Sequence, residues 1–198
     1  MIKFNNLKQV TPYILFKEKY DAAYNSSQKN IEAIAVASYD KQKNEVDSRF
    51  VNLKSIEKEK FIFFSNYNSP KSIAFESHNQ ITALIFWPSI NVQIRLKAKI
   101  HRTSLEYNQK YFEQRSFDKN VLAISSNQSS PAKSHKEILE KYEKKKKIKD
   151  LSQCPEYWGG FSFTPYYFEF WEGNEFRINK RVVFEKVYED WNQFILEP

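Results

Sequence analysis

Residues 92–101 read Val-Gln-Ile-Arg-Leu-Lys-Ala-Lys-Ile-His, and this stretch decides the fold class. Every even-numbered position is apolar, and every odd-numbered position is polar or charged. Strict alternation over ten residues is typical of a β-strand that turns one face to a hydrophobic core and the other to solvent. The stretch therefore predicts a strand with one face buried in a core.

Further strands are predicted where short runs are rich in β-branched and aromatic residues. One of them, Ile81–Trp87, is apolar along most of its length, which predicts a strand buried on both faces. The additional predicted strands are Ile31–Tyr39, Arg49–Lys54, Phe61–Asn66, Ile81–Trp87, Phe161–Phe163, Tyr167–Trp171, Arg177–Asn179 and Arg181–Tyr188.

Helices are predicted where apolar residues recur at helical spacing behind a capping residue or a proline. The predicted helices are Pro12–Tyr24, Lys71–Ser77, Ser104–Arg115 and Pro131–Lys149. Strands that are mostly antiparallel, with a few helices outside them, indicate an α+β fold that is mainly β and forms a barrel. No linker is long enough to separate domains, so we expect residues 1–198 to form a single domain.

The counts of glycine, cysteine and histidine exclude several kinds of site. Only 3 glycines occur, so neither a dinucleotide fingerprint, nor a P-loop, nor a nucleophile elbow can be built. A single cysteine, Cys154, excludes an internal disulfide, and the 3 histidines lack metal-ligand spacing, so no metal is expected. A bound phosphate would have to be held largely by side chains.

The net charge of +7 raises the possibility of a nucleic acid partner. However, Glu140–Asp150 holds six lysines and three acidic residues, and such a run on a helix is usually a solvated face. No apolar run is long enough to span a membrane. Met1–Tyr13 lacks the basic and then apolar pattern of a secretory signal. We expect a cytoplasmic protein that has neither nucleic acid nor membrane as a partner.

Cations beside aromatic strands suit a ligand that carries a phosphate and a flat ring. The candidates are Arg49, Lys54, Lys71, Arg95, Arg115, Arg177 and Arg181. Their order and spacing make this interpretation more specific. The motifs that carry them or lie between them are RFVNLK (49–54), FFSN (63–66), SPK (69–71), YFEQR (111–115), NQS (127–129), WGGF (158–161), EFWEG (169–173) and RINKR (177–181).

In this collinear order, from about Pro12 to Pro198, the chain resembles the pyridoxine (pyridoxamine) 5′-phosphate oxidases. The resemblance implies a six-stranded antiparallel split β-barrel with peripheral helices, of the FMN-binding type. It also implies a homodimer with FMN between the subunits and a C-terminal part, about 155–198, for dimerisation and substrate. The implied activity is the FMN-dependent oxidation of pyridoxamine or pyridoxine 5′-phosphate to pyridoxal 5′-phosphate, with O₂ as acceptor and release of H₂O₂.

The resemblance also assigns roles to individual residues. Arg177 is the implied catalytic residue, over the pyridine ring of the substrate. The implied substrate-binding residues are Lys54, Tyr111, Arg115, Lys119, Arg177 and Asn179. The implied cofactor-binding residues are Arg49, Phe50, Val51, Asn52, Leu53, Lys54, Phe64, Ser65, Lys71, Gln93, Gln128, Ser129, Trp171 and Arg181, of which Gln93, Trp171 and Arg181 reach the flavin from the partner chain.

Departures from the family pattern leave alternatives open. Pro70 stands in place of a phosphate-binding arginine, Lys119 in place of a serine, and Asn179 in place of a histidine. An FMN-dependent paralogue that acts on a different ring, such as a phenazine, is therefore a second hypothesis. A third is a barrel that binds single-stranded nucleic acid by stacking. Trp158-Gly-Gly is interpreted as a structural turn.

Overall fold

The computed structural model describes residues 1–148 and 150–198. This part of the chain contains ten strands, five α-helices and a short 3-10 helix at Pro88–Ile90. The strands are β1 (Lys3–Asn5), β2 (Ala33–Asp40), β3 (Glu45–Asn52), β4 (Ser55–Glu57), β5 (Lys60–Asn66), β6 (Gln80–Trp87), β7 (Val92–Arg102), β8 (Trp158–Glu172), β9 (Lys180–Val187) and β10 (Asp190–Ile195). The helices are α1 (Thr11–Asn25), α2 (Pro70–Ser77), α3 (Leu105–Glu113), α4 (Phe117–Ser125) and α5 (His135–Lys146).

The ten strands form one sheet in the order β1-β4-β5-β8-β7-β6-β2-β3, with β9 beside β8 and β10 beside β9. Along the six successive strands from β5 to β3, every neighbouring pair is antiparallel. These six correspond to the predicted antiparallel barrel. The other four extend it, and β1 pairs with β4 in parallel. The mainly β, split-barrel prediction is confirmed.

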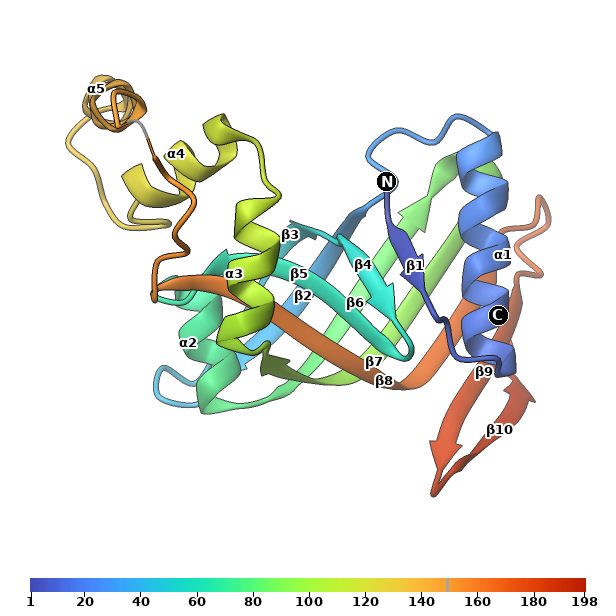
Figure 1. Ribbon diagram of the computed structural model, residues 1–198. Helices are drawn as coiled ribbons and strands as arrows, with labels where there is room; N and C mark the ends of the chain where they lie inside the picture. The colour runs from blue at the N-terminus through green and yellow to red at the C-terminus, as the bar shows by residue number, and fades with distance from the viewer. Residues whose placement is uncertain (149) are drawn as a thin grey trace.

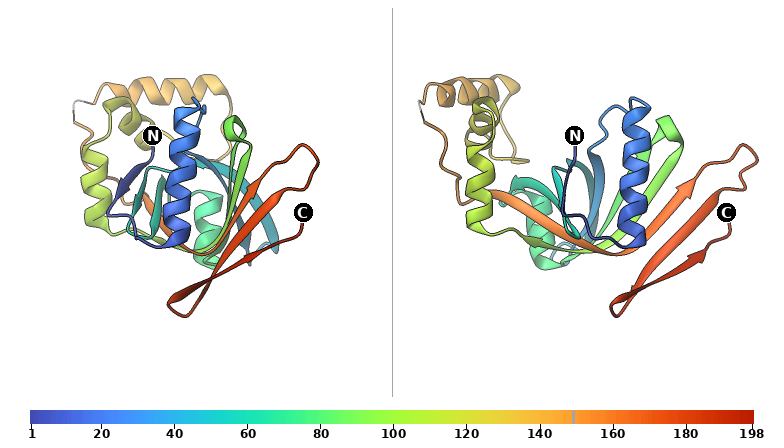
Figure 2. Two further views of the ribbon diagram at one scale, coloured as in Figure 1. Left: turned by 90° about the vertical axis from the view of Figure 1, so that its right-hand side faces the viewer. Right: turned by 45° about the vertical axis from the view of Figure 1, so that its right-hand side comes forward.

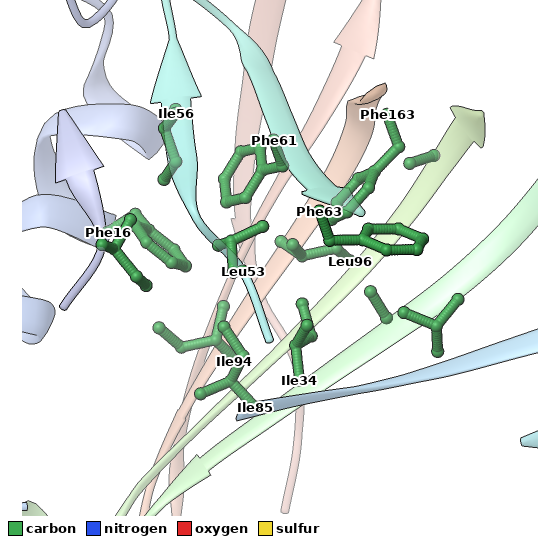
Figure 3. Packing of buried hydrophobic residues seen from close by; sticks show 14 of the residues in the cluster. Phe16, Ile34, Leu53, Ile56, Phe61, Phe63, Ile85, Ile94, Leu96 and Phe163 are labelled. Atoms are coloured by element: carbon green, nitrogen blue, oxygen red, sulfur yellow. The ribbon is translucent and has the colours of Figure 1, made fainter. Parts of the chain in front are cut away.

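The hydrophobic core lies within the curved sheet. Along β7, even-numbered residues are buried as far as Ile100, whereas the odd-numbered residues are partly or fully exposed, as the alternation predicts. Figure 3 shows Leu53 and Leu96 among the core side chains, and both are fully buried. Phe16 of α1 completes this core, with its ring centroid 5.1 Å from that of Phe61.

The helices lie at the periphery of the barrel, and α1 packs one face onto its core. Figures 1 and 2 show α3, α4 and α5 grouped at one end, and α1 with the β9–β10 hairpin at the other. None of the described helices is both long enough and apolar enough to span a membrane.

Several predicted boundaries need correction. The Ile81–Trp87 strand is not buried on both faces: Phe86 is 53% exposed, because only one face of β6 packs on the core. The strands predicted at Phe161–Phe163 and Tyr167–Trp171 are one strand, β8, with a bulge where Lys97 pairs with Tyr167 and Ala98 with Pro165. A bulge accommodates a proline that an unbroken ladder would reject.

The strand predicted at Arg177–Asn179 is wrong, since these residues form the loop between β8 and β9. Arg177 adopts a left-handed backbone with φ of 60°, and its N–H donates to the carbonyl of Asn174 at 3.0 Å. The helix predicted at Pro131–Lys149 is α5, which is shorter, and Lys149 lies outside the described residues. Helix α4 and strands β1, β4 and β10 were not predicted.

Gly159 and Gly160 lie in strand β8 rather than in a turn, and they allow α3 to approach the sheet closely. The Asn108 side chain on α3 donates to the hydroxyl of Tyr67 at 2.9 Å and accepts from the N–H of Gly160 at 2.8 Å. A Cβ atom on Gly159 would overlap both the Tyr67 hydroxyl and the Asn108 amide.

We therefore expect Gly159→Ala to destabilise the fold by about 3 kcal/mol, through overpacking and loss of these hydrogen bonds. Thermal unfolding should show a fall in Tm of roughly 6–12 °C. Gly173→Ala is the matched control. The three atoms nearest to its Cβ would all belong to the side chain of Asn91, which is exposed, so its Tm should change little. Equal effects of the two substitutions would contradict this account.

Candidate functional site

A cleft of about 1030 Å³ opens beside α3 and is lined by residues between Met1 and Trp158. Its walls come from strands β1, β3, β4, β5 and β8, from helices α2, α3 and α4, and from the segment after α4. Most of the predicted site residues line this cleft: Arg49, Phe50, Val51, Asn52, Lys54, Phe64, Ser65, Lys71, Tyr111, Arg115, Lys119, Gln128 and Ser129.

Two cations, Arg49 and Lys71, form the first charged group of the cleft. The Arg49 guanidinium is oriented by the hydroxyl of Ser38, to which it donates at 2.7 Å, and by the carboxylate of Asp47. Lys71 is only 7% exposed, and its Nζ donates to the hydroxyl of Ser69 at 3.1 Å. Burial, together with the neighbouring Arg49, lowers the pKa of Lys71 to about 8. A buried cation next to another cation is electrostatically prepared for an anion.

The segment after α4 is attached to β5 beside this pair. The side-chain oxygen of Gln128 accepts from the hydroxyl of Ser65 at 3.2 Å and from the N–H of Asn66 at 3.1 Å. Ser129 follows with a left-handed φ of 65° and also lines the cleft. Neutral hydrogen-bonding groups therefore lie beside the two cations, as a phosphate site requires.

Lys54, Arg115 and Lys119 form the second charged group. Burial lowers the pKa of Lys54, and the nearby charges of Lys119 and Arg115 lower it further, although Glu32 opposes them. An Arg115 Nη2 proton is donated to the backbone carbonyl of Lys119 at 3.1 Å. Arg115 Nη1 is buried and has no hydrogen-bond partner among the residues that the structure describes. A partly buried guanidinium whose buried Nη1 has no partner suits an anionic ligand.

Parallel aromatic rings line the cleft between α3 and β5. Phe64 stacks on Tyr111 with ring centroids 3.6 Å apart and on Trp158 at 5.1 Å, with interplanar angles of 11° and 10°. The Arg115 guanidinium lies over the Trp158 ring, 4.3 Å from its centroid. Flat apolar walls of this kind suit a planar ring, and they hold Arg115 in place.

Several residues of the cleft were not predicted from the sequence, and Trp158, Tyr107 and Glu57 are the ones with defined contacts there. The tryptophan of WGGF was interpreted as part of a turn, whereas its side chain lines the cleft. Tyr107 donates to Glu57 at 2.6 Å, and burial together with this hydrogen bond raises the pKa of Tyr107 to about 12. No local motif announces this contact, because its two residues lie fifty positions apart.

Gln93, Trp171 and Arg181 lie outside the cleft of their own chain. They face one another across β7, β8 and β9, since Gln93 pairs with Trp171 and Trp171 pairs with Arg181. All three side chains are partly exposed on the outer face of the sheet. The structure thus groups the predicted residues into two sets, one in the cleft and one on this outer row.

The other predicted residues lie elsewhere. Leu53 is fully buried among the core residues, so only its backbone is available to a ligand (Figure 3). Arg177 lies in the exposed β8–β9 loop, where the Asn179 side chain accepts from the N–H of Asn174 at 3.1 Å. Burial raises the pKa of the Cys154 thiol to about 11, which favours its protonated form at neutral pH.

Comparisons with known proteins agree with this geometry. Residues 158–198 match the family described as "Pyridoxine 5′-phosphate oxidase C-terminal dimerisation region". A pyridoxine/pyridoxamine 5′-phosphate oxidase of Coxiella burnetii is 32% identical over 188 residues, which cover 94% of this chain and 95% of that protein. The enzyme of the same name from Christiangramia forsetii is 34% identical over 193 residues, covering 94% and 88%.

The fold is also that of solved structures. The crystal structure of PhzG from Burkholderia lata 383, in complex with tetrahydrophenazine-1-carboxylic acid, superimposes with a TM-score of 0.89 at 19% identity. It covers 98% of this chain and 100% of the PhzG chain. An FMN-binding protein from Nostoc punctiforme, related to pyridoxamine 5′-phosphate oxidase, superimposes with a TM-score of 0.79 at 10% identity.

Proposed function

Because the chain belongs to the pyridoxine/pyridoxamine 5′-phosphate oxidase family, we propose that it oxidises pyridoxamine or pyridoxine 5′-phosphate to pyridoxal 5′-phosphate. In this reaction O₂ is the electron acceptor and H₂O₂ is released. The chain is an FMN-dependent oxidoreductase of this family, so the specific substrate is the part that needs an argument from the site.

The observation that carries the proposal is the presence of two separate groups of cations in one cleft. The charge of Arg49 lowers the pKa of Lys71, whereas the charges of Lys119 and Arg115 lower the pKa of Lys54. A cofactor with one phosphate and a substrate with another need two such groups, with space for stacked rings between them. A ring substrate without a phosphate would offer no anion to the charges of Lys54, Arg115 and Lys119.

The first group fits the phosphate of FMN. Arg49 and Lys71 would hold the charge, and Ser65, Gln128 and Ser129 would supply hydrogen bonds. When bound, FMN supplies a two-electron acceptor that oxygen can reoxidise. No side-chain nucleophile is needed for this chemistry, and the chain's residues bind, orient and shield the reactants.

The second group would hold the 5′-phosphate of the substrate. Lys54, Arg115 and Lys119 supply charge, and Tyr111, held against Phe64, bounds the space for the pyridine ring. Lys119 is a cation where the family has serine, which keeps the site suited to phosphate.

A second copy of the chain completes the proposed site. We treat residues 1–198 as one domain whose C-terminal part, about 155–198, forms the dimer, in agreement with the dimerisation-region match. The outer row of Gln93, Trp171 and Arg181 would then reach the flavin of the partner, and the exposed loop of Arg177 and Asn179 would cover its substrate.

The test is an anaerobic titration of the purified FMN-bound protein with pyridoxamine 5′-phosphate and, separately, with pyridoxine 5′-phosphate. The visible flavin band should disappear with either compound. Admission of oxygen should restore the band and yield one H₂O₂ for each pyridoxal 5′-phosphate. A flavin that stays oxidised with both compounds would rule the proposal out.

That outcome would favour the second candidate, an FMN-dependent enzyme for another ring. Asn179 motivates it, since an amide cannot carry the charge of the histidine it replaces and is already engaged within its own loop. Pro70, at the start of α2, is a second reason, because it stands where the family has a phosphate-binding arginine.

Lys71 gives the proposed phosphate site a defined pH dependence. Its pKa of about 8 belongs to the ligand-free protein, and a phosphate dianion would raise it. Binding above pH 8 must therefore take up a proton. Once the FMN phosphate is a dianion, near pH 7, FMN affinity should be flat up to pH 8 and fall by up to about tenfold per pH unit above it. Fluorescence titration of the apoprotein from pH 6 to pH 10 measures this slope.

Lys71→Met is the matching variant. It should bind FMN about thirtyfold more weakly, and Lys71's contribution to the pH slope should vanish. Since the folded state disfavours the buried ammonium, the ligand-free variant should be at least as stable as the parent by thermal unfolding. A variant that loses stability but keeps FMN affinity would assign Lys71 to the fold instead.

A further inference from the structure

Glu169 is a buried carboxylate held between two arginines on the outer face of the sheet. It is 3% exposed, and it lies on β8 between Arg95 of β7 and Arg181 of β9. Arg95 donates from Nε at 3.0 Å and from Nη2 to one carboxylate oxygen, and Arg181 donates from Nε at 2.9 Å and Nη2 at 2.7 Å to the other. Tyr167 adds its hydroxyl at 3.2 Å.

The arginine pair keeps this carboxylate charged. Burial alone would raise the pKa of Glu169, but the hydrogen bonds from Arg95 and Arg181 outweigh it, and the pKa is lowered. The carboxylate therefore remains an anion at neutral pH. A buried ion pair of this kind contributes little net stability compared with apolar packing, so stability alone does not account for it.

The ion pair also fixes the orientation of the Arg181 side chain. Its Nε and Nη2 are bound to Glu169, and its Nη1 donates to the backbone carbonyl of Glu197 at 2.8 Å. Three of the five N–H donors of a guanidinium are thus engaged, and two remain for a ligand. The plane of the Arg181 guanidinium is therefore fixed. Arg181 pairs with Trp171 of the neighbouring strand, and both lie within the region that matches the dimerisation family.

We propose that Glu169 is a positioning residue, which holds the Arg181 guanidinium so that its two remaining donors reach the flavin bound by a second copy of the chain. The proposal rests on the proposed function, because it requires Arg181 to contact FMN. Without the carboxylate, an arginine side chain has many rotamers, and only a fraction of them would present the donors correctly.

The test is a double-mutant cycle on FMN affinity. Purified apoprotein of the parent, Glu169→Gln, Arg181→Met and the double variant is titrated with FMN. We expect Arg181→Met to weaken binding about tenfold and Glu169→Gln about fivefold. The double variant should be about tenfold weaker rather than fiftyfold, because both changes remove the same contact. An additive result would overturn the proposal.

Arg95→Met is the matched control, since it removes the other arginine and leaves the Arg181–Glu169 pair in place. It should keep FMN affinity within about twofold and leave the visible circular dichroism of the bound flavin unchanged, whereas Glu169→Gln and Arg181→Met should alter that spectrum in the same way. A spectrum altered as much by Arg95→Met would contradict a role that acts through Arg181.

Two further outcomes separate this inference from the proposed function. If Arg181→Met binds FMN normally, both the inference and the predicted role of Arg181 fail. If Arg181→Met weakens binding and Glu169→Gln does not, only the inference fails. Glu169→Asp, which keeps the charge on a shorter side chain, replaces the glutamine variant in the cycle if the latter does not yield a folded dimer by size-exclusion chromatography.

Discussion

Arg49→Ala should purify without its yellow colour, with FMN bound at least about 100-fold more weakly than by the parent. The loss follows from the position of the guanidinium. The Ser38 hydroxyl and the Asp47 carboxylate fix it at the cleft, and without it Lys71 is the one cation left in this group. Removing Arg49 leaves a phosphate dianion with little fixed charge to meet.

Folding should survive this substitution, because β3 lies at the end of the sheet path and Arg49 contributes no core packing. Circular dichroism and thermal unfolding of the apoprotein check this point. Arg102→Ala is the control: Arg102 is an exposed cation that pairs with Glu76 outside the cleft, and its removal should leave FMN affinity unchanged. If Arg49→Ala retained FMN at normal affinity, the flavin phosphate would have to lie elsewhere.

Arg49→Lys gives a graded version of the same experiment. Lysine keeps the charge but loses the planar pair of donors, so the affinity for FMN should fall by about tenfold. An affinity equal to that of Arg49→Ala would mean that the hydrogen-bond geometry, and not the charge, is what matters at this position.

The barrel could be predicted from the sequence because its strands carry their own pattern. The alternation in Val92–His101 records which face of β7 is buried, and the structure confirms it residue by residue as far as Ile100. The same reasoning failed at Ile81–Trp87. An apolar residue on an outer face, such as Phe86, cannot be distinguished by sequence from one in the core.

The loop at Arg177–Asn179 misled for a related reason. Phe176 and Ile178 give it the composition of a strand, although they are 80% and 71% exposed. These side chains are exposed in the single chain and lie within the region that matches a dimerisation family, so the local fold alone does not account for their apolar character.

Most of the cleft was predictable only through the family resemblance. Arg49, Lys54 and Lys71 lie in short motifs, and the structure brings them to one cleft. In contrast, Trp158 and the Tyr107–Glu57 pair came to light only from the three-dimensional arrangement. Tyr107 joins α3 to β4 and Trp158 joins β8 to β5, and nothing in the spacing along the chain records such contacts.

Arg115→Met should raise the KM for pyridoxamine 5′-phosphate by about 100-fold and leave kcat within a few-fold of the parent. Arg115 Nη1 is buried without a partner in the described part of the chain, so a substrate phosphate would gain a charge-assisted bond that the free protein does not make. Methionine keeps an apolar contact with Trp158 and removes the charge together with the hydrogen bond to the Lys119 carbonyl. Steady-state peroxide production measures both constants.

FMN affinity separates this role from a general effect on the cleft. Arg115 belongs to the group of Lys54 and Lys119 rather than to that of Arg49 and Lys71, so the variant should bind FMN as tightly as the parent. Lys110→Met, a lysine at the rim of the cleft that already pairs with Glu106 at 2.7 Å, is the matched control and should change KM by less than about threefold. An Arg115 variant with an unchanged KM would show that the substrate carries no phosphate or binds it elsewhere. A variant that released FMN instead would show that the two cation groups serve one ligand, and the case for a phosphorylated substrate would then fail.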